Sequence, residues 1–181
     1  MEKIKWGIIG PGNIANNFAD GLKGSYSGQL VSIASKSEDR RKNFGDKYDI
    51  HPDFRFDSYE DIINSEHIDA IYISTPHTLH AEWTIKAAGK GKHILCEKPG
   101  AINFNEGKKI IDAVREAGVF YMEGFMYRCH PQIPKLVEII KNKIIGDVIS
   151  IETSFGFDMG KTIPDHRLFN KNLAGGGILD V

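Results

Sequence analysis

Long apolar runs, an excess of one charge and a set of paired cysteines are all missing from this 181-residue sequence. No apolar run approaches the roughly 18 residues that a membrane-spanning helix needs, so no membrane span is expected. The 23 Lys and Arg are matched by 24 Asp and Glu, which argues against a nucleic-acid-binding protein. Cys96 and Cys129 are too few for a disulfide framework and predict a reduced, cytoplasmic setting. The N-terminus has no signal-peptide cleavage site, so it is interpreted as a strand.

What is present is an alternation of short apolar segments with helical patterns. A hydrophobic content of 41% is enough to build a packed core. Strands that alternate with helices predict βαβ units and a doubly wound parallel sheet that is covered on both faces. The expected strands are 4–9, 30–34, 70–73, 93–96 and 119–122, and the expected helices are 13–22, 38–48, 78–88 and 103–117.

The pattern changes after residue 122. Residues 131–143 form an amphipathic helical pattern, and residues 147–157 alternate in the way of a half-exposed strand of an antiparallel sheet. One such strand without its sheet would leave an apolar face and an open edge. The change of pattern therefore predicts a boundary near residue 122, with residues 123–181 as a piece of a second domain.

A glycine turn follows the first predicted strand. Gly10 to Ala15 reads Gly-Pro-Gly-Asn-Ile-Ala and fits the pattern G-x-G-x-x-G/A. The first glycine permits the tight turn, the second lets the backbone approach a pyrophosphate, and the small third residue lets the helix pack on the strand. Because the turn opens a helix inside a βαβ unit, it predicts a Rossmann domain that binds a dinucleotide over residues 1–122. The phosphates are expected at Gly10, Gly12, Asn13 and Ile14. A glycine turn without a ligand is the alternative.

The end of the second strand bears on the choice of cofactor. An acidic residue there would bind the ribose 2′-hydroxyl of NAD, but this sequence has Ser35, Lys36 and Ser37, followed by Arg40 and Arg41. Hydroxyl groups and cations suit a 2′-phosphate, so NADP is favoured and NAD remains the alternative. Lys36 and Arg40 can also be solvated surface charges, and Glu38 or Asp39 can still reach a ribose.

Two later strands end in segments with several polar and ionisable residues. Both segments are expected at the carboxyl edge of the parallel sheet, where doubly wound folds bind their ligands. Ser74, Thr75 and Pro76 can form a wall for the ribose and nicotinamide, followed by His77 and His80, for which helix-start or surface roles are the alternative. The other strand ends in Glu97, Lys98 and Pro99. A lysine beside the nicotinamide can donate or accept a proton as the hydride moves, and Glu97 can pair with it or orient it.

Other polar groups give weaker signals. Cys96 and Cys129 have no pattern for zinc or redox chemistry, and the histidines and acids show no metal-ligand spacing, so no metal is expected. Tyr127, Arg128 and His130 either line a substrate cleft or pack between domains.

Taken together, these motifs resemble the Gfo/Idh/MocA family of oxidoreductases, the group of glucose–fructose oxidoreductase and inositol dehydrogenase. The resemblance rests on the glycine turn, on Tyr-Ile-Ser-Thr-Pro at 72–76 with His80, and on Cys-Glu-Lys-Pro at 96–99. It continues over residues 123–131 and over Gly-Gly-Gly-Ile-Leu-Asp at 175–180. The Ser35-Lys36 pattern looks most like the branch of NADP-dependent dihydrodiol dehydrogenase and D-xylose dehydrogenase.

The resemblance implies a two-domain enzyme that moves a hydride between the nicotinamide of NADP or NAD and a hydroxyl-bearing carbon of a sugar, polyol or diol. It places Lys98 near the reacting hydroxyl, and Asp180 matches an acidic residue of the family's active site, so Lys98 and Asp180 are the expected catalytic residues. The resemblance also implies that residues 123–181 begin a second α/β domain with a large, mostly antiparallel sheet, in the N-terminal part of a longer protein, and that this domain forms a homo-oligomer.

The chain departs from the family at its end. The family's second domain is longer than residues 123–181 allow, and its proposed His or Tyr proton donor would fall after Val181. The chain is therefore interpreted as truncated in its C-terminal domain. A non-catalytic NAD(P)-binding regulator and an inactive fragment remain alternatives.

Overall fold

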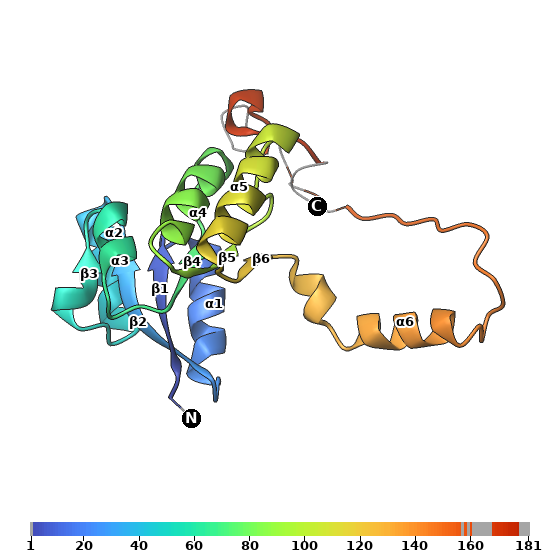
Figure 1. Cartoon of the computed structure of the whole chain (residues 1–181), viewed down its shortest axis with the longest axis horizontal. Coiled ribbons are helices and arrows are strands. Elements are labelled where there is room, and N and C mark those ends of the chain that lie inside the picture. Colours follow the sequence, from blue (N-terminus) through green and yellow to red (C-terminus); the bar gives the residue numbers. More distant parts are fainter. Residues whose placement is uncertain (1, 157, 159, 161–167, 178–181) are drawn as a thin grey trace.

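The computed structural model describes residues 2–156, 158, 160 and 168–177. The parallel sheet consists of β1 (Ile4–Ile9), β2 (Gly28–Ala34), β3 (Arg55–Phe56), β4 (Ala70–Ile73), β5 (His93–Cys96) and β6 (Tyr121–Glu123). The strand order is β3-β2-β1-β4-β5-β6, and every neighbouring pair is parallel. This is the order of a doubly wound Rossmann sheet, with its switch point between β1 and β4 (Figure 1).

Helices cover both faces of the sheet because successive strand residues point to opposite sides. On one face, Ile8 and Tyr72 pack with α1 (Asn13–Lys23) and α2 (Glu38–Lys47). On the other face, Ile9 and Ile71 pack with helices that follow later in the chain. These are α3 (Tyr59–Asn64), α4 (His80–Ala88) and, partly buried, α5 (Phe104–Ala117). The core is therefore split by the sheet into two apolar layers.

Local signals explain where the helices begin and end. Ser37, Ser58 and Asn103 each cap a helix by accepting a hydrogen bond from a backbone N–H of its first turn. Gly118 ends α5 in the left-handed conformation, with φ at 65°, which a glycine adopts without strain. Short 3-10 turns complete the element list: η1 (Pro52–Phe54), η2 (His77–Leu79), η3 (Met126–Cys129) and η4 (Lys171–Leu173).

The predicted Rossmann pattern is confirmed, with four differences. The sequence patterns did not indicate β3 or α3, which lie between β2 and β4. The predicted helix 78–88 divides into the 3-10 turn η2 and α4, and the last strand runs over Tyr121–Glu123 instead of 119–122. The predicted strand 147–157 is wrong for the residues that the structure describes there, since 147–156 have no strand. A strand is stabilised by a partner, and the described residues offer this segment none.

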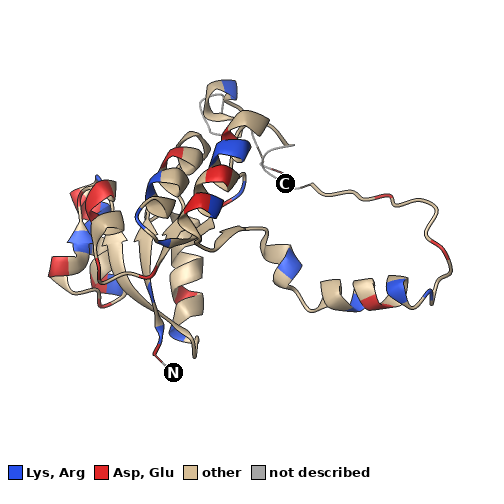
Figure 2. Cartoon of the chain, in the orientation of Figure 1, with Lys and Arg blue, Asp and Glu red and all other residues tan. Residues whose placement is uncertain are grey.

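The chain after β6 leaves the sheet. Figure 1 shows α6 (Gln132–Lys141) standing apart from the layered part, followed by an extended segment. Apolar side chains are exposed along this stretch, among them Leu136, Ile145, Ile149 and Phe155. Figure 2 shows residues of both charges along α2, α4 and α5. Within the described residues, no helix is long and apolar enough to cross a membrane.

Candidate functional site

The glycine turn lies at the carboxyl edge of β1 and is held by the neighbouring strand. Gly10 has φ at 89°, and a Cβ there would come within 3.0 Å of the Ser74 carbonyl oxygen. The Ser74 hydroxyl donates to the Gly10 carbonyl oxygen at 2.7 Å. Gly12 precedes α1, and a Cβ at Gly12 would meet no protein atom within 4 Å. The turn is therefore packed tightly behind Gly10 and open in front of Gly12.

The first turn of α1 faces this open space. No side chain caps the helix, and its first turn contains no acidic residue. The N–H groups at the start of a helix, together with the positive end of its dipole, attract anions. Since the space before Gly12 is not filled by protein, the turn fits a dinucleotide pyrophosphate.

A pocket of about 480 Å³ lies beside the glycine turn. It lies between the start of α1 and the carboxyl ends of β4 and β5, which carry the Ser-Thr-Pro and Glu-Lys-Pro segments. The Thr75 hydroxyl oxygen is buried there and has no hydrogen-bond partner among the residues that the structure describes. The lining residues are Ile14, Ser74, Thr75, Pro76, His77, His80, Glu97, Lys98, Met126 and Leu173. Seven of the residues predicted from the sequence thus meet in one pocket: Ile14, Ser74, Thr75, Pro76, His80, Glu97 and Lys98.

The loop after β5 is fixed by carboxylates. The Tyr72 hydroxyl donates to Glu97 Oε1 at 2.5 Å. The Gly100 N–H donates to Glu123 Oε1 at 2.7 Å, and the Lys98–Pro99 peptide bond between these two anchors is cis. The loop is therefore tied to the sheet on both sides of Lys98, which lies partly buried in the pocket.

His80 is buried completely at the start of α4, with 0% exposure. Its Nε2 lies 2.8 Å from the Thr75 carbonyl oxygen, and its Nδ1 lies 2.8 Å from the Pro99 carbonyl oxygen. Both ring nitrogens are thus engaged by backbone, and the ring joins the loops after β4 and β5. This arrangement favours a positioning role over direct contact with a cofactor.

The residues predicted to select the cofactor lie at the end of β2, outside the pocket. Ser35 is buried, its hydroxyl accepts from the Ser37 N–H at 3.2 Å, and its carbonyl oxygen accepts from the Arg41 guanidinium at 2.7 Å. The Lys36 ammonium lies over the Tyr59 ring at 5.7 Å. Burial raises the pKa of the Tyr59 hydroxyl, and the Arg40 charge opposes this rise. Lys36 and Arg40 are both exposed, and Lys36 faces an aromatic ring.

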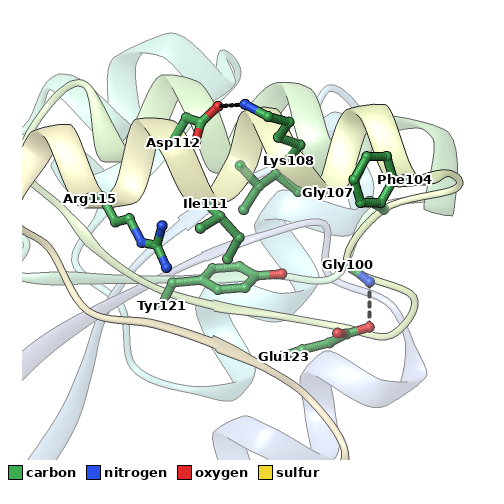
Figure 3. A pocket seen from close by; sticks show the side chains of 11 residues that line it. Gly100, Phe104, Gly107, Lys108, Ile111, Asp112, Arg115, Tyr121 and Glu123 are labelled. Atoms are coloured by element: carbon green, nitrogen blue, oxygen red, sulfur yellow. Dashed lines mark hydrogen bonds and ion pairs between the residues drawn. The ribbon is translucent and has the colours of Figure 1, made fainter.

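A second pocket, of about 500 Å³, lies between α5 and the edge strand β6. Figure 3 shows the Ile111 and Arg115 side chains directed from α5 toward Tyr121, with the Glu123–Gly100 hydrogen bond below. Lys108 and Asp112 form an ion pair on the outer side of α5, at 2.7 Å. None of the residues predicted for the site lines this pocket. It also lies away from the glycine turn, so the pocket beside α1 is the candidate site.

Sequence reasoning missed several features of the site. It left His77 open between a site and a helix start, and the structure places this side chain, buried, in the pocket lining. Nothing in the sequence pattern indicated Leu173, which comes from the short turn η4. Met126 belongs to the segment 123–131 that resembles the family, but the sequence did not predict it as a pocket residue. Asp180, a predicted catalytic residue, lies outside the described residues.

Known proteins match this chain along nearly all of its length. Trans-1,2-dihydrobenzene-1,2-diol dehydrogenase of Xenopus tropicalis is 35% identical over 179 residues, which is 98% of this chain and 53% of that protein. D-xylose 1-dehydrogenase (NADP(+)) 2 of Haloferax volcanii is 34% identical over 178 residues, 98% of this chain and 54% of that protein. The chain therefore spans about half the length of the curated relatives it matches.

Among solved structures, aldose-aldose oxidoreductase from Caulobacter crescentus, complexed with glycerol, superposes with a TM-score of 0.90 at 27% identity. The match covers 99% of this chain and 54% of that one. The sequence profile of the Gfo/Idh/MocA family, described as an oxidoreductase family with an NAD-binding Rossmann fold, matches residues 4–125. With the strand order, the glycine turn and the Glu-Lys-Pro loop in place, this chain belongs to the Gfo/Idh/MocA family.

Proposed function

We propose that this chain belongs to an oxidoreductase that transfers a hydride between NADP and a hydroxyl-bearing carbon of a sugar, polyol or diol. One observation carries the proposal: the pocket beside the glycine turn brings Ile14 at the start of α1 together with Glu97 and Lys98. A nucleotide seated on α1 would thus have its reactive end at the lysine. The names of the two curated relatives, a diol dehydrogenase and a xylose dehydrogenase, support this class of substrate.

The glycine turn and α1 would hold the phosphates. Gly10 keeps the turn tight, the open space at Gly12 would admit the pyrophosphate, and the amides of Asn13 and Ile14 would bind it. Further along, Ser74, Thr75 and Pro76 would wall the ribose and the nicotinamide. The unpartnered Thr75 hydroxyl suits a polar group of the ligand, because a buried hydroxyl gains stability from a hydrogen bond.

NADP is the preferred cofactor in this proposal. Ser35 and Ser37 supply hydroxyl groups at the end of β2, and Lys36 and Arg40 are exposed cations in the same segment. Such a group of donors suits the two negative charges of a 2′-phosphate. The D-xylose relative is named for NADP, which agrees with this choice.

Lys98 would handle the proton. A bound nicotinamide would supply or accept the hydride. In the reducing direction the Lys98 ammonium would give a proton to the carbonyl oxygen of the substrate, and in the oxidising direction the neutral Lys98 amine would take the proton of the reacting hydroxyl. Glu97, adjacent in the chain, fixes the loop through Tyr72. Asp180 is proposed to act with Lys98, on the strength of the family motif alone.

We further propose two domains: a nucleotide-binding domain over 1–122 and the beginning of a substrate and oligomer domain over 123–181. The apolar side chains exposed after β6 support this division, since such surfaces ordinarily pack against other structure. Among them are Leu136, Val137, Ile149, Ile151 and Phe155. A homo-oligomer formed through that domain, and a cytoplasmic setting suited to the free thiols Cys96 and Cys129, belong to the same proposal.

Titration of the chain with NADPH and NADH, followed by fluorescence, tests the nucleotide site first. Tighter binding of NADPH is expected, and failure to bind either nucleotide would contradict the proposal. Turnover is then measured over a panel of sugars, polyols and diols. NADPH binding without turnover on any of them would instead assign the chain to nucleotide binding without catalysis.

Substitution of the lysine separates binding from catalysis. Lys98→Met is expected to keep NADPH binding and to lower turnover about 100-fold or more, as the loss of a general acid or base does. Lys90→Met removes an exposed lysine from the turn before β5 and serves as the control. Equal turnover of the two variants would remove Lys98 from the chemistry.

A further inference from the structure

Tyr72 places a polar group inside the core. It lies in the middle of β4, a strand whose other residues are Ala70, Ile71 and Ile73, and its side chain is 2% exposed. An aliphatic residue would fill the same layer without a hydroxyl that needs a partner. Packing alone therefore does not explain why a tyrosine occupies this position.

The partner of this hydroxyl is a residue of the candidate site. Tyr72 donates to Glu97 Oε1 at 2.5 Å across 25 positions of sequence. Among the described residues, nothing is hydrogen-bonded to the other oxygen of that carboxylate, Oε2. Glu97 also lines the pocket, next to Lys98. One oxygen of the carboxylate is thus fixed from inside the protein, and the other is left for a ligand.

The backbone of Gly124 closes over the same carboxylate. The Gly124 N–H donates to the Cys96 carbonyl oxygen at 2.7 Å, and a Cβ at Gly124 would lie 3.3 Å from Glu97 Oε1. The Glu97 side chain is therefore confined between the Tyr72 hydroxyl and a glycine that brings the main chain close.

Aromatic stacking fixes the tyrosine ring. Phe18 of α1 stacks on Tyr72 with ring centroids 4.1 Å apart and planes at 27°. Trp6 of β1 packs its ring edge to face on Phe18 at 5.2 Å. Because Phe18 belongs to the helix that follows the glycine turn, this column links the phosphate end of the site to the Glu97 end.

The buried Tyr72 hydroxyl holds its proton more tightly than a solvent-exposed tyrosine does. Burial, and then the hydrogen bond to Glu97, raise the pKa of Tyr72. A tyrosine in this state donates to a carboxylate and does not release the proton to it. The bond therefore orients the Glu97 carboxylate.

We infer that Tyr72 is a positioning residue, which holds Glu97 so that Oε2 accepts a hydroxyl of the nicotinamide ribose beside Lys98. This inference rests on the proposed function, because it requires a nucleotide in the pocket. The choice of the ribose follows from the chemistry of the free oxygen: a carboxylate accepts from hydroxyl groups and repels phosphates.

A double-mutant cycle on NADPH binding tests this role. Tyr72→Phe keeps the ring and its stacking but removes the hydroxyl, and we expect the Kd for NADPH to rise about ten-fold. Glu97→Gln removes the carboxylate and is expected to raise the Kd by at least as much. If Tyr72 acts only through Glu97, adding Tyr72→Phe to Glu97→Gln changes the Kd by less than about two-fold. A purely structural role would give the same loss in both backgrounds and would overturn the inference.

Two further variants serve as a control for the loss of a hydroxyl and as a second test of the Tyr72–Glu97 hydrogen bond. Tyr48→Phe removes another buried hydroxyl, which donates to Asn16 Oδ1 at 2.9 Å, and it should leave the Kd within about two-fold. Glu97→Asp keeps a carboxylate but shortens the side chain and so withdraws it from the Tyr72 hydroxyl. It should weaken NADPH binding as much as Tyr72→Phe does. This variant tests the same hydrogen bond if Tyr72→Phe fails to fold. An unchanged Kd in Glu97→Asp would overturn the inference while the proposed function stands. A wild-type chain that binds neither nucleotide would overturn both.

Discussion

The imidazole of His80 joins two loops that are far apart in the sequence, with Nδ1 at 2.8 Å from the Pro99 carbonyl oxygen. Its other nitrogen lies 2.8 Å from the carbonyl oxygen of Thr75. Because both loops line the pocket, this one buried ring sets the spacing between the Ser-Thr-Pro segment and the Glu-Lys-Pro segment. A carbonyl oxygen only accepts, so a neutral ring donates to one of the two at a time.

We predict that His80→Ala destabilises the fold and loosens the site together. The carbonyl group that accepts from the ring would lose its donor, and a cavity would replace the buried ring, which lowers the free energy of unfolding by about 3 kcal/mol. Urea unfolding measures this change. His51→Ala removes an exposed imidazole that caps η1 by accepting from the Asp53 N–H, and it should lower the free energy of unfolding by no more than about 1 kcal/mol. Equal stability of the two variants would show that the bridge contributes nothing.

The two glycines of the turn are predicted to respond in opposite ways to alanine. Gly10 has φ at 89° and no room behind it, so Gly10→Ala is expected to lower the free energy of unfolding by about 1–3 kcal/mol. Gly12 has φ at -91° and open space, so Gly12→Ala should fold with wild-type stability but bind NADPH far more weakly. Paired urea unfolding and NADPH titration distinguish the two effects.

The contrast gives its own control, since each variant adds one methyl group to the same turn. If Gly12→Ala bound NADPH as the wild type does, the space before α1 would not be the pyrophosphate site. If Gly10→Ala kept full stability, the contact with the Ser74 carbonyl oxygen would be relieved by a shift of the loop.

Local signals in the sequence were sufficient for the elements that surround the site. The strands 70–73 and 93–96 were predicted with the bounds that the structure shows, because each is a short apolar segment closed by a proline-containing turn. β3 escaped prediction because Arg55–Phe56 is only 2 residues long and pairs through β2. The pattern at 147–157 is that of a strand, but a pattern cannot supply the neighbour on which a strand depends.

The composition of the pocket was predicted better than the contacts within it. The motifs identified Glu97, Lys98 and His80 as site residues because strand ends in a parallel sheet meet at one edge. The partners of these side chains are distant in sequence: Tyr72 lies 25 positions from Glu97, and Pro99 lies 19 from His80. Only the folded arrangement of β4 and β5 brings them together, so no spacing in the sequence could indicate them.

The cofactor preference is predicted to depend on the exposed cations at the end of β2. The double variant Lys36→Ala with Arg40→Ala should raise the Kd for NADPH about ten- to 100-fold, because two charge-assisted hydrogen bonds to the 2′-phosphate are lost. The Kd for NADH, which has no such phosphate, should stay within about two-fold. Fluorescence titration of both nucleotides gives the ratio.

Another lysine of α2 controls for the loss of positive charge near the end of β2. Lys42 pairs with Asp46 at 3.0 Å and lies on an exposed part of α2, so Lys42→Ala should change neither Kd. A parallel loss of NADPH and NADH binding in the double variant would contradict a phosphate-specific role. It would instead indicate that the loop after β2 supports both nucleotides.

The two cysteine thiols are predicted to differ in reactivity. Cys96 has 0% exposure at the end of β5, whereas Cys129 is exposed. Burial raises the pKa of the Cys96 thiol from 9.0 to about 12, so it stays protonated and unreactive in the folded chain. A thiol reagent at pH 8 should therefore modify one cysteine per native chain and two after denaturation. Cys129→Ser should abolish the native reaction.

The same shift makes stability depend on pH in a definite direction. Below pH 9.0 the thiol is protonated in both the folded and the unfolded chain, so it has no effect. Between 9.0 and about 12 the unfolded chain releases this proton and the folded chain keeps it, so the free energy of unfolding falls as the pH rises. Urea unfolding of the wild type and of Cys96→Ala between pH 8 and 10.5 isolates the contribution, because the variant lacks this group. A wild-type chain that lost no more stability than the variant over this range would show that Cys96 ionises in the folded state as readily as in the unfolded one.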